Sequence, residues 1–346
     1  MRPRYPQRAR EVPKAPAKRH DRAAEQTGSR ASARHRHHVT SNSTAHRVVQ
    51  TFLKPFREMG IAECRAAFDA LCMSQPPSRA RIATAVDLKI PGPGGQIPLR
   101  IYTPQGDGPF PVLMYFHGGG WVIGSLDAYD IICRELCFGA SALVVSVDYR
   151  LSPECRFPAA TNDCLEATRW AGEFACEING DAHRIAVSGD SAGGNLAAVT
   201  ALRVRDEGGP NLCAQLLVYP VINGGVLPTH SMVENGKGYL LEGADMKWFF
   251  DHYVGSLSDR YRPNCSPILA NSLSNLPPAL VQTMEFDPLR DEGENYANAL
   301  KEAGGTVTLS RYVGAIHGTL CFVTSLDQGR AMMDESTYWL SQRFRS

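Results

Sequence analysis

A serine, an aspartate and a histidine follow one another along the second half of the chain, in an order that could support acyl transfer. Ser191 stands at the centre of a G-x-S-x-G pentapeptide, residues 189–193. A hydroxyl is a poor nucleophile at its ordinary pKa and needs a neighbouring base. His317 is the candidate base, and Asp287 is the candidate carboxylate that fixes the histidine tautomer and stabilises the imidazolium. We expect these three side chains to share one site.

Three consecutive glycines after His117 could stabilise the negative charge of a tetrahedral intermediate. Because glycine has no Cβ, the backbone N–H groups of Gly118 and Gly119 can turn inward. Ala192, directly after the candidate nucleophile, supplies a third N–H group. Each such donor is worth on the order of 10²–10³ in rate. We predict an oxyanion hole built from these three amides, with His117 bracing the loop.

Several residues near these motifs have a structural and a functional interpretation. Asp291 is the rival of Asp287, but Pro288 favours a turn at Asp287, whereas Asp291 suits the first turn of a helix. Four residues have two possible roles: they could pack or hydrogen-bond locally, or they could line a substrate pocket. These residues are Trp121, Asp190, Tyr219 and Thr319. We expect Asp148, Arg150 and Glu154 to form a charge-assisted hydrogen-bond network that fixes the loop at residues 148–154.

Apolar runs typical of buried strands alternate with stretches of helical periodicity from residue 111 onward. Strands are predicted over 111–116, 143–147, 184–188, 214–219, 278–283 and 306–312. Helices are predicted over 128–138, 158–177, 192–207, 290–303 and 326–344. A hairpin of strands 83–90 and 97–103 comes before them. This alternation predicts an α/β fold with a mostly parallel, doubly wound sheet, whose carboxyl edge would gather the candidate catalytic residues.

Two segments outside this alternation are expected to cover the edge of the sheet. Apolar residues at helical spacing occupy residues 48–82, with Gly60 between two short helices. The alternation breaks again over 221–267, where an aromatic-rich helical stretch around Trp248 is expected. Because these amphipathic segments must lie on something apolar, we interpret both as parts of a helical cap. The core then comprises residues 83–220 and 268–346.

The first 47 residues differ in composition from the rest. Residues 1–50 hold 12 Lys and Arg against 3 Asp and Glu, a net charge of +9, and the remainder of the chain carries −8. With few large apolar side chains, residues 1–47 are expected to form a disordered basic tail. Three interpretations of this segment remain open: a solvated tail, an arm that binds anionic polymers, and a transit-like peptide.

The composition sets further expectations about location and cofactors. The chain has 346 residues, of which 43% are hydrophobic and 21% are charged, as in globular enzymes. Ten cysteines are scattered without metal-ligand spacing, and no apolar leader or membrane-length apolar run is present. We therefore expect free thiols, a cytoplasmic location, no metal and no specific nucleic acid, and leave a homodimer open.

Five segments together resemble the hormone-sensitive-lipase-like group of α/β-hydrolases, the bacterial family IV carboxylesterases. These segments are HGGGW at 117–121, DYRLSPE at 148–154, GDSAGGN at 189–195, DPLRDE at 287–292 and IHG at 316–318. The resemblance covers about residues 50–346. It implies an eight-stranded α/β-hydrolase core with a helical cap, and hydrolysis of short- to medium-chain acyl esters without a cofactor. The sequence departs from the family pattern at Thr319 and Met284, which concern the shape of the pocket.

The leading functional hypothesis is therefore a serine carboxylesterase. An aryl-formamidase or related amidase is the near alternative, because the HGGGW motif also occurs in that relative. A catalytically silent hydrolase fold that serves as a ligand receptor is less favoured, since such proteins typically lose the base and His317 is present.

Overall fold

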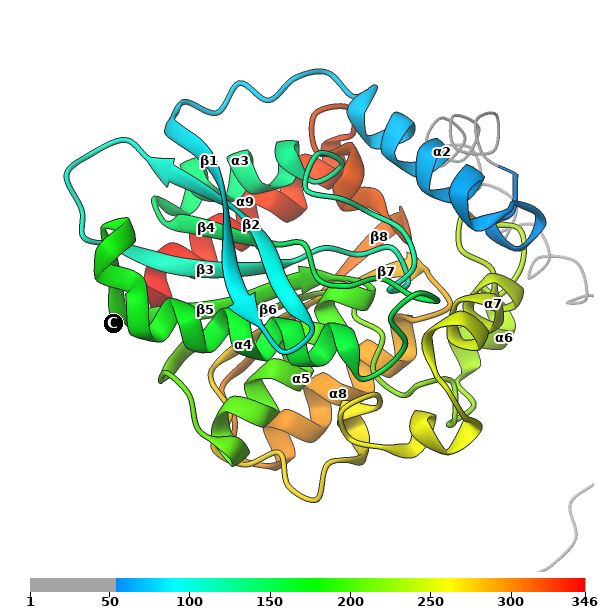
Figure 1. Ribbon diagram of the computed structural model, residues 1–346. Coiled ribbons are helices and arrows are strands. Elements are labelled where there is room, and N and C mark those ends of the chain that lie inside the picture. The colour runs from blue at the N-terminus through cyan, green and yellow to red at the C-terminus, as the bar shows by residue number, and fades with distance from the viewer. Residues whose placement is uncertain (1–53, 346) are drawn as a thin grey trace, which may run out of the picture. The chain divides into compact units, whose positions relative to one another are not determined.

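An eight-stranded sheet organises the computed structural model, in which residues 54–345 are described (Figure 1). The strand order is β1-β2-β4-β3-β5-β6-β7-β8. The first two pairings, β1 with β2 and β2 with β4, are antiparallel, and all later pairings are parallel. The strands are β1 Ile82–Gly92, β2 Gly95–Pro104, β3 Phe110–Phe116, β4 Leu143–Val147, β5 Gly180–Asp190, β6 Leu212–Val218, β7 Ala279–Phe286 and β8 Val307–Ile316. The predicted fold class is confirmed.

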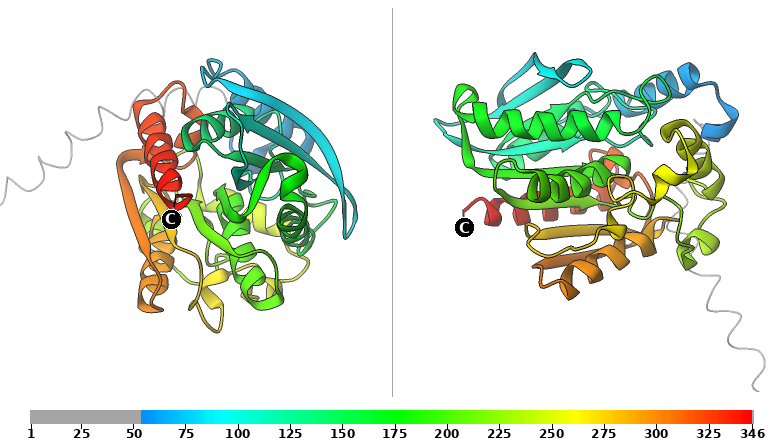
Figure 2. Two further views of the ribbon diagram at one scale, coloured as in Figure 1. Left: turned by 90° about the vertical axis from the view of Figure 1, so that its left-hand side faces the viewer. Right: turned by 60° about the horizontal axis from the view of Figure 1, so that its bottom comes forward.

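Helices cover both faces of the sheet (Figure 2). One apolar cluster joins the sheet to α4 (Ala159–Phe174), α5 (Ala192–Glu207) and α8 (Arg290–Glu302). A second cluster joins the opposite face to α3 (Asp130–Ala140) and α9 (Asp327–Arg343). Strands between these layers are buried on both sides, which explains why they appear in the sequence as unbroken apolar runs.

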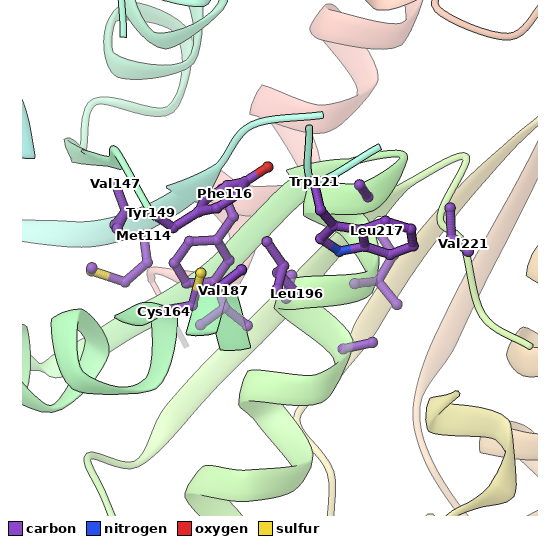
Figure 3. Close-up of a cluster of buried hydrophobic side chains, with 14 of the residues drawn as sticks. Met114, Phe116, Trp121, Val147, Tyr149, Cys164, Val187, Leu196, Leu217 and Val221 are labelled. Atoms are coloured by element: carbon purple, nitrogen blue, oxygen red, sulfur yellow. The ribbon is translucent and has the colours of Figure 1, made fainter. Parts of the chain in front are cut away.

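The central strand β3 shows this arrangement residue by residue. Its alternate side chains Met114 and Phe116 belong to the first cluster, where Phe116 packs near Val187 and Leu196 (Figure 3). Its intervening residues, Leu113 and Tyr115, belong to the second cluster. All seven residues of β3 are buried. A charged residue in this strand would therefore lose its hydration on either face.

Short helices lie at the carboxyl end of the sheet. They are η1 (Phe56–Glu58), α2 (Ile61–Met73), α6 (His230–Glu234), α7 (Gly243–Tyr253), η3 (Leu257–Tyr261) and η4 (Pro267–Leu269). Figure 1 shows α2, α6 and α7 at the same end of the molecule, although α2 comes from a different part of the chain. Gly60 separates η1 from α2, as predicted. The first predicted helix is only a three-residue 3₁₀ turn within the described residues.

The other predicted helices and strands differ from the observed ones mainly at their ends. The predicted helix 158–177 is divided into α4 and a 3₁₀ turn, η2 (Ala175–Ile178). A further turn, η5 (Thr319–Phe322), precedes α9. All ten cysteines are free thiols, as predicted. No helix within residues 54–345 is long and apolar enough to span a membrane. The predicted tail, residues 1–47, lies outside the described residues.

Candidate active site

Ser191 lies at a sharp turn between the end of β5 and the first residue of α5. Its backbone angles, φ 56° and ψ −118°, are strained for a residue with a side chain. The flanking glycines allow the turn to pack against β3. A Cβ atom at Gly193 would lie 1.9 Å from the carbonyl oxygen of Phe116, and one at Gly189 would lie 2.4 Å from the same atom. The G-x-S-x-G pattern therefore reflects close backbone packing around a hydroxyl that faces the cavity.

Three predicted side chains converge beyond the ends of β5, β7 and β8. His317 Nε2 lies 2.9 Å from Ser191 Oγ, and His317 Nδ1 lies 2.8 Å from Asp287 Oδ2. With a proton on Nδ1, the imidazole donates to the carboxylate and can accept the serine proton at Nε2. All three residues are less than one-tenth exposed. The arrangement is suited to moving a proton from the hydroxyl to the imidazole.

The carboxylate of Asp287 is held in place by its surroundings. The amide of Leu289 donates to Asp287 Oδ1 at 2.8 Å. The side chain of Asn235, from the segment after α6, donates to the carbonyl oxygen of Asp287 at 3.3 Å. Together with the bond to His317, these contacts fix both the carboxylate and its backbone. Strand β7 thus delivers a carboxylate with a defined orientation.

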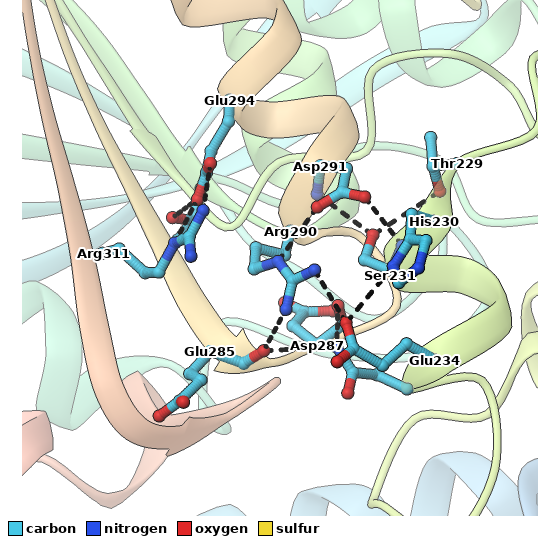
Figure 4. A network of polar contacts seen from close by, with 12 residues as sticks. Thr229, His230, Ser231, Glu234, Glu285, Asp287, Arg290, Asp291, Glu294 and Arg311 are labelled. Atoms are coloured by element: carbon cyan, nitrogen blue, oxygen red, sulfur yellow. Dashed lines mark hydrogen bonds and ion pairs between the residues drawn. The ribbon is translucent and has the colours of Figure 1, made fainter. Parts of the chain in front are cut away.

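Asp291, the rival of Asp287, belongs to a different network (Figure 4). Asp291 Oδ2 accepts a hydrogen bond from the amide of Ser231 at 2.7 Å, and Asp291 Oδ1 accepts one from Arg290 at 2.9 Å. Arg290 also pairs with Glu234 of α6 at 3.0 Å. These contacts tie α8 to α6 and leave Asp291 without a bond to His317.

The structure of the glycine loop after β3 differs from the prediction for the Gly118 amide. The N–H group of Gly118 donates to Asp190 Oδ1 at 2.9 Å, so it is not free to meet an oxyanion. The next two glycines, Gly119 and Gly120, line the cavity beside Ser191 with φ values of 103° and 59°. Within residues 54–345, the amides of these two glycines have no hydrogen-bond acceptor. The prediction of Gly118 was wrong by one position, because it ignored an acceptor on the neighbouring strand.

That acceptor, Asp190, anchors the glycine loop from its position at the end of β5. Besides Gly118, it accepts hydrogen bonds from the hydroxyls of Tyr115 at 2.8 Å and Tyr129 at 3.2 Å. Burial raises the pKa of Asp190 to about 6, against the opposing effect of these hydrogen bonds. Asp190 also borders the cavity, as predicted. Its hydrogen bonds show that it positions the loop.

His117 braces the same loop, as predicted. Its Nδ1 lies 2.7 Å from the carbonyl oxygen of Gly118, and its ring stacks on Tyr149 with the ring centroids 4.3 Å apart. The Tyr149 hydroxyl donates to the carbonyl oxygen of His117 at 2.7 Å. Burial lowers the pKa of His117 to about 4, which favours a neutral ring.

A pocket opens onto Ser191 and His317, with about 690 Å³ of space that includes open solvent. Its wall is mostly apolar. The apolar and thiol side chains in it are Phe56, Phe68, Leu71, Cys72, Ile123, Val221, Leu240, Leu241, Met246, Phe249, Cys321 and Phe322. Tyr219 lines the cavity as predicted, and its ring centroid lies 4.7 Å from that of His317. The site can therefore hold an apolar group against the serine hydroxyl.

Two predicted pocket residues do not line this cavity. Trp121 is fully buried and stacks on Tyr253, with ring centroids 4.0 Å apart and ring planes 4° apart. The Thr319 hydroxyl donates to the carbonyl oxygen of Ile316 at 2.7 Å and is buried beneath the turn. For both residues packing or local hydrogen bonding, and not a place in the pocket wall, describes the side chain, because proximity in sequence to His117 or His317 does not tell which way a side chain points.

The predicted charge network at residues 148–154 is also different in the structure. Arg150 pairs with Asp163 of α4 at 2.7 Å, and Glu154 pairs with Arg65 of α2 at 2.7 Å. The amide of Asp148 donates a hydrogen bond to the carbonyl oxygen of Pro98 at 3.0 Å. The three residues therefore tie the loop to three other elements instead of pairing with one another.

Sequence reasoning missed several residues at the site. Gly120 was the third member of a recognised glycine run, and the structure places it in the cavity wall. Glu292 is buried, and its Oε1 accepts a hydrogen bond from the amide of Ile222 at 2.6 Å. The cavity residues from α2 and η5 carried no motif. The helical spacing of residues 48–82 predicted a cap but not which of its side chains would line the cavity, and residues 319–322 had no such spacing.

Comparisons with known proteins identify the family of the chain. A family model described as the alpha/beta hydrolase fold matches residues 113–321, more than half of the chain. The carboxylic ester hydrolase LipN of Mycobacterium tuberculosis is 46% identical over 267 residues, which cover 75% of this chain and 70% of LipN. The carboxylesterase NlhH of the same organism is 46% identical over 231 residues, covering 65% of this chain and 72% of NlhH.

Solved structures extend the match over the rest of the fold. A hyperthermophilic esterase from the archaeon Pyrobaculum calidifontis superposes with a TM-score of 0.80 at 40% identity, covering 86% of this chain and 97% of the esterase. The chain therefore belongs to the α/β-hydrolase family, within its hormone-sensitive-lipase-like group of esterase-type hydrolases.

Proposed function

We propose that the protein is a serine carboxylesterase that hydrolyses short- to medium-chain acyl esters through a covalent acyl-enzyme. The observation that carries this proposal is the continuous hydrogen-bonded series from Ser191 through His317 to Asp287. The names of relatives such as LipN and NlhH, which are ester hydrolases, support the same reaction class.

The first half-reaction forms the acyl-enzyme. Ser191 Oγ attacks the ester carbonyl carbon while His317 Nε2 takes the hydroxyl proton, and Asp287 stabilises the resulting imidazolium. The tetrahedral intermediate then collapses, and the alcohol leaves with the proton held by His317. In the second half-reaction His317 activates a water molecule, which releases the acid from Ser191. Water is the acceptor, and the proposed route needs no cofactor.

Three amides are proposed to stabilise the oxyanion: those of Gly119, Gly120 and Ala192. The two glycine amides have no competing acceptor within residues 54–345 and border the cavity. Ala192 opens α5, where the first amides have no partner within the helix and the helix dipole favours negative charge. Asp190 holds the start of the glycine loop through Gly118, so that the donors are fixed before the reaction begins.

We propose that η1, α2 and the 221–267 segment form a cap over the cavity. Both parts supply cavity residues, such as Phe56 and Phe249, whose ring centroids are 5.3 Å apart. Phe249 also packs directly on the glycine loop, where a Cβ atom at position 120 would lie 2.2 Å from its ring. The absence of a side chain at Gly120 leaves room for Phe249. The cap would therefore exclude water while an apolar acyl group occupies the site.

Hydrolysis of p-nitrophenyl esters with acyl chains from C2 to C16 tests the proposal. We expect the highest kcat/KM among the short and medium chains, because the apolar wall of the cavity limits the length that fits. The Ser191→Ala variant should lose about 10⁴–10⁶ in kcat. Preference for N-formylkynurenine over every ester would instead favour the amidase alternative. Binding of ester without turnover would favour a receptor.

A further inference from the structure

The glycine loop leads into a residue with an unusual backbone conformation. Trp121 follows Gly119 and Gly120, whose amides are the proposed oxyanion donors, and it has a φ of 60°. The two glycines have φ values of 103° and 59°, which a residue without a Cβ atom tolerates. A tryptophan adopts such an angle only where the surrounding contacts hold it there. The contacts of Trp121 therefore bear on the direction of the two donor amides.

The indole ring of Trp121 is held by α7, which belongs to the proposed cap. It is fully buried and stacks on Tyr253, the last residue of α7, with ring centroids 4.0 Å apart and ring planes 4° apart. Phe250, three residues earlier, packs against the same ring at 5.3 Å. Among the residues that the structure describes, neither the indole N–H group nor the Tyr253 hydroxyl has a hydrogen-bond partner. The faces of the rings, and not their polar groups, therefore make this contact.

The segment that leads into α4 supports both members of this stacked pair. The amide of Ser152 donates a hydrogen bond to the carbonyl oxygen of Trp121 at 2.9 Å, and the amide of Phe157 donates one to the carbonyl oxygen of Tyr253 at 2.8 Å. The Phe157 ring also meets the Tyr253 ring edge-on, with centroids 5.7 Å apart and planes at 76°. Backbone bonds and ring packing thus fix Tyr253 as a support for the indole.

Two different parts of the molecule hold the two ends of the glycine loop. At its start, Asp190 of β5 accepts a hydrogen bond from the amide of Gly118 at 2.9 Å. At its end, α7 holds the ring of Trp121. Between them, the carbonyl oxygen of Gly119 accepts a hydrogen bond from the amide of Ile123 at 3.0 Å, which closes a tight turn. The directions of the two donor amides therefore depend on the support at both ends.

We propose that Tyr253 is a positioning residue, which acts through Trp121 to aim the amides of Gly119 and Gly120 at the developing oxyanion. This inference rests on the proposed function. Tyr253 is not among the residues that line the cavity, so its effect on the reaction is indirect. The oxyanion develops only as the reaction proceeds. Loss of the support should therefore lower kcat and leave KM nearly unchanged.

Three substitutions in α7 test the role of the ring face. Tyr253→Leu removes the flat face and should lower kcat for p-nitrophenyl butyrate about 10- to 100-fold, with KM within about threefold of the wild-type value. Tyr253→Phe keeps the ring and loses only a hydroxyl without a partner, so it should retain most of kcat. Trp248→Leu is the matched control, because Trp248 belongs to the same helix and its ring packs against His252 and Phe249. We expect it to leave kcat unchanged.

An inhibitor separates a positioning effect from a general loss of structure. An alkyl trifluoromethyl ketone forms a tetrahedral adduct with a serine nucleophile and carries an oxyanion, whereas the secondary alcohol of the same chain length does not. Tyr253→Leu should weaken inhibition by the ketone by the same factor as kcat/KM and should leave inhibition by the alcohol unchanged. Combining it with Trp121→Leu should lower kcat no further than the larger single effect, because both act through one contact.

Urea unfolding shows whether each variant folds, and Tyr253→Met, whose flexible side chain refills the space, replaces a Tyr253→Leu variant that does not. The same loss of kcat is expected for it. Unchanged kcat in the folded variant would overturn the inference, as would a loss confined to KM or an equal loss in Trp248→Leu. Equal losses in Tyr253→Phe and Tyr253→Leu would also overturn it, since the ring face would then be irrelevant.

These outcomes leave the proposed function intact, because the wild-type protein hydrolyses esters in each of them. A wild-type protein that neither hydrolyses esters nor forms an adduct with the trifluoromethyl ketone would instead refute the proposed function, and this inference with it.

Discussion

At the residue scale, the role of Asp287 can be separated from that of its close neighbour Asp291. Asp287→Asn should lower kcat by about 10⁴, because an amide cannot hold the imidazole in the required tautomer or stabilise its charge. Asp291→Asn should keep kcat within a few-fold of the wild-type value, because its side chain contacts Ser231 and Arg290 instead of His317. Steady-state kinetics on one short-chain ester compare the two variants. A large loss in the Asp291 variant alone would reverse the assignment.

Glu292 gives a prediction about pH and stability. Burial raises its pKa from an ordinary 4.5 to about 8, against the hydrogen bond from Ile222. A carboxyl with a raised pKa in the folded state binds more protons there than in the unfolded state. Its contribution to stability is therefore present below pH 4.5 and is lost as the pH rises toward 8.

Replacement with glutamine tests this prediction, because Gln keeps the acceptor oxygen and cannot ionise. The stability difference between Glu292→Gln and the wild type should shift in favour of the variant between pH 5 and pH 8, by about 1.4 kcal/mol per pH unit at most. Urea unfolding at several pH values measures this. Parallel pH profiles for the two proteins would show that Glu292 does not titrate in this range.

The three polar residues that meet beside the cavity can be picked out in the sequence, because each belongs to a recognisable local pattern. Ser191 is surrounded by glycines that the turn requires, and His317 and Asp287 each follow a predicted strand. The direction of a backbone amide is not a local property. Gly118 donates to Asp190, which lies on a neighbouring strand and 72 positions later in the chain. Without that contact the sequence could not show that the amide of Gly118 is already engaged.

At the element scale, an ion-pair cluster joins η1 to α7 above the cavity. Arg57 pairs with Asp245 at 2.9 Å and with Glu242 at 3.0 Å, and Asp245 is almost completely buried. Arg57→Ala would leave the Asp245 carboxylate without its cation, which should lower the free energy of unfolding by about 1 kcal/mol after allowance for solvent at Arg57. It should also raise KM for medium-chain esters more than it changes kcat.

A matched control lies three residues earlier. Lys54 pairs with Glu63 at 3.8 Å, but both side chains are exposed, so Lys54→Ala should change neither stability nor KM measurably. Urea unfolding and ester kinetics on both variants supply the comparison. Equal effects of the two substitutions would indicate that the Arg57 cluster does not hold the cap over the site.

Elements of the core were predicted more accurately than those at its edge. The helix after Ser191 has the predicted bounds, 192–207, because a glycine ends it and the nucleophile turn begins it. The segment 221–267 forms only short helices, α6 and α7 among them. Their positions depend on contacts with α2, α8 and the cavity, which come from distant parts of the sequence. Local periodicity does not specify such contacts.

At the scale of the whole molecule, the cavity wall predicts which acyl groups are accepted. No lysine or arginine occurs among the cavity residues, all of which belong to the described part of the chain, and the carboxylate of Asp190 borders the space. An acyl group with a terminal carboxylate would lose its hydration without gaining a cationic partner. We expect kcat/KM for p-nitrophenyl hemisuccinate to be about 100-fold lower than for p-nitrophenyl butyrate. Similar values for both esters would show that the acyl group remains in solvent.

The central claim concerns the nucleophile, and covalent trapping tests it most directly. Incubation with a p-nitrophenyl alkylphosphonate should release one nitrophenolate per chain and leave the phosphonyl group on Ser191, as located by peptide mass spectrometry. Ser191→Ala should remain unmodified under the same conditions, and Asp287→Asn should react far more slowly because its histidine is a poorer base. Labelling of another residue at the same rate, or stoichiometric labelling of Ser191→Ala, would contradict the proposed mechanism.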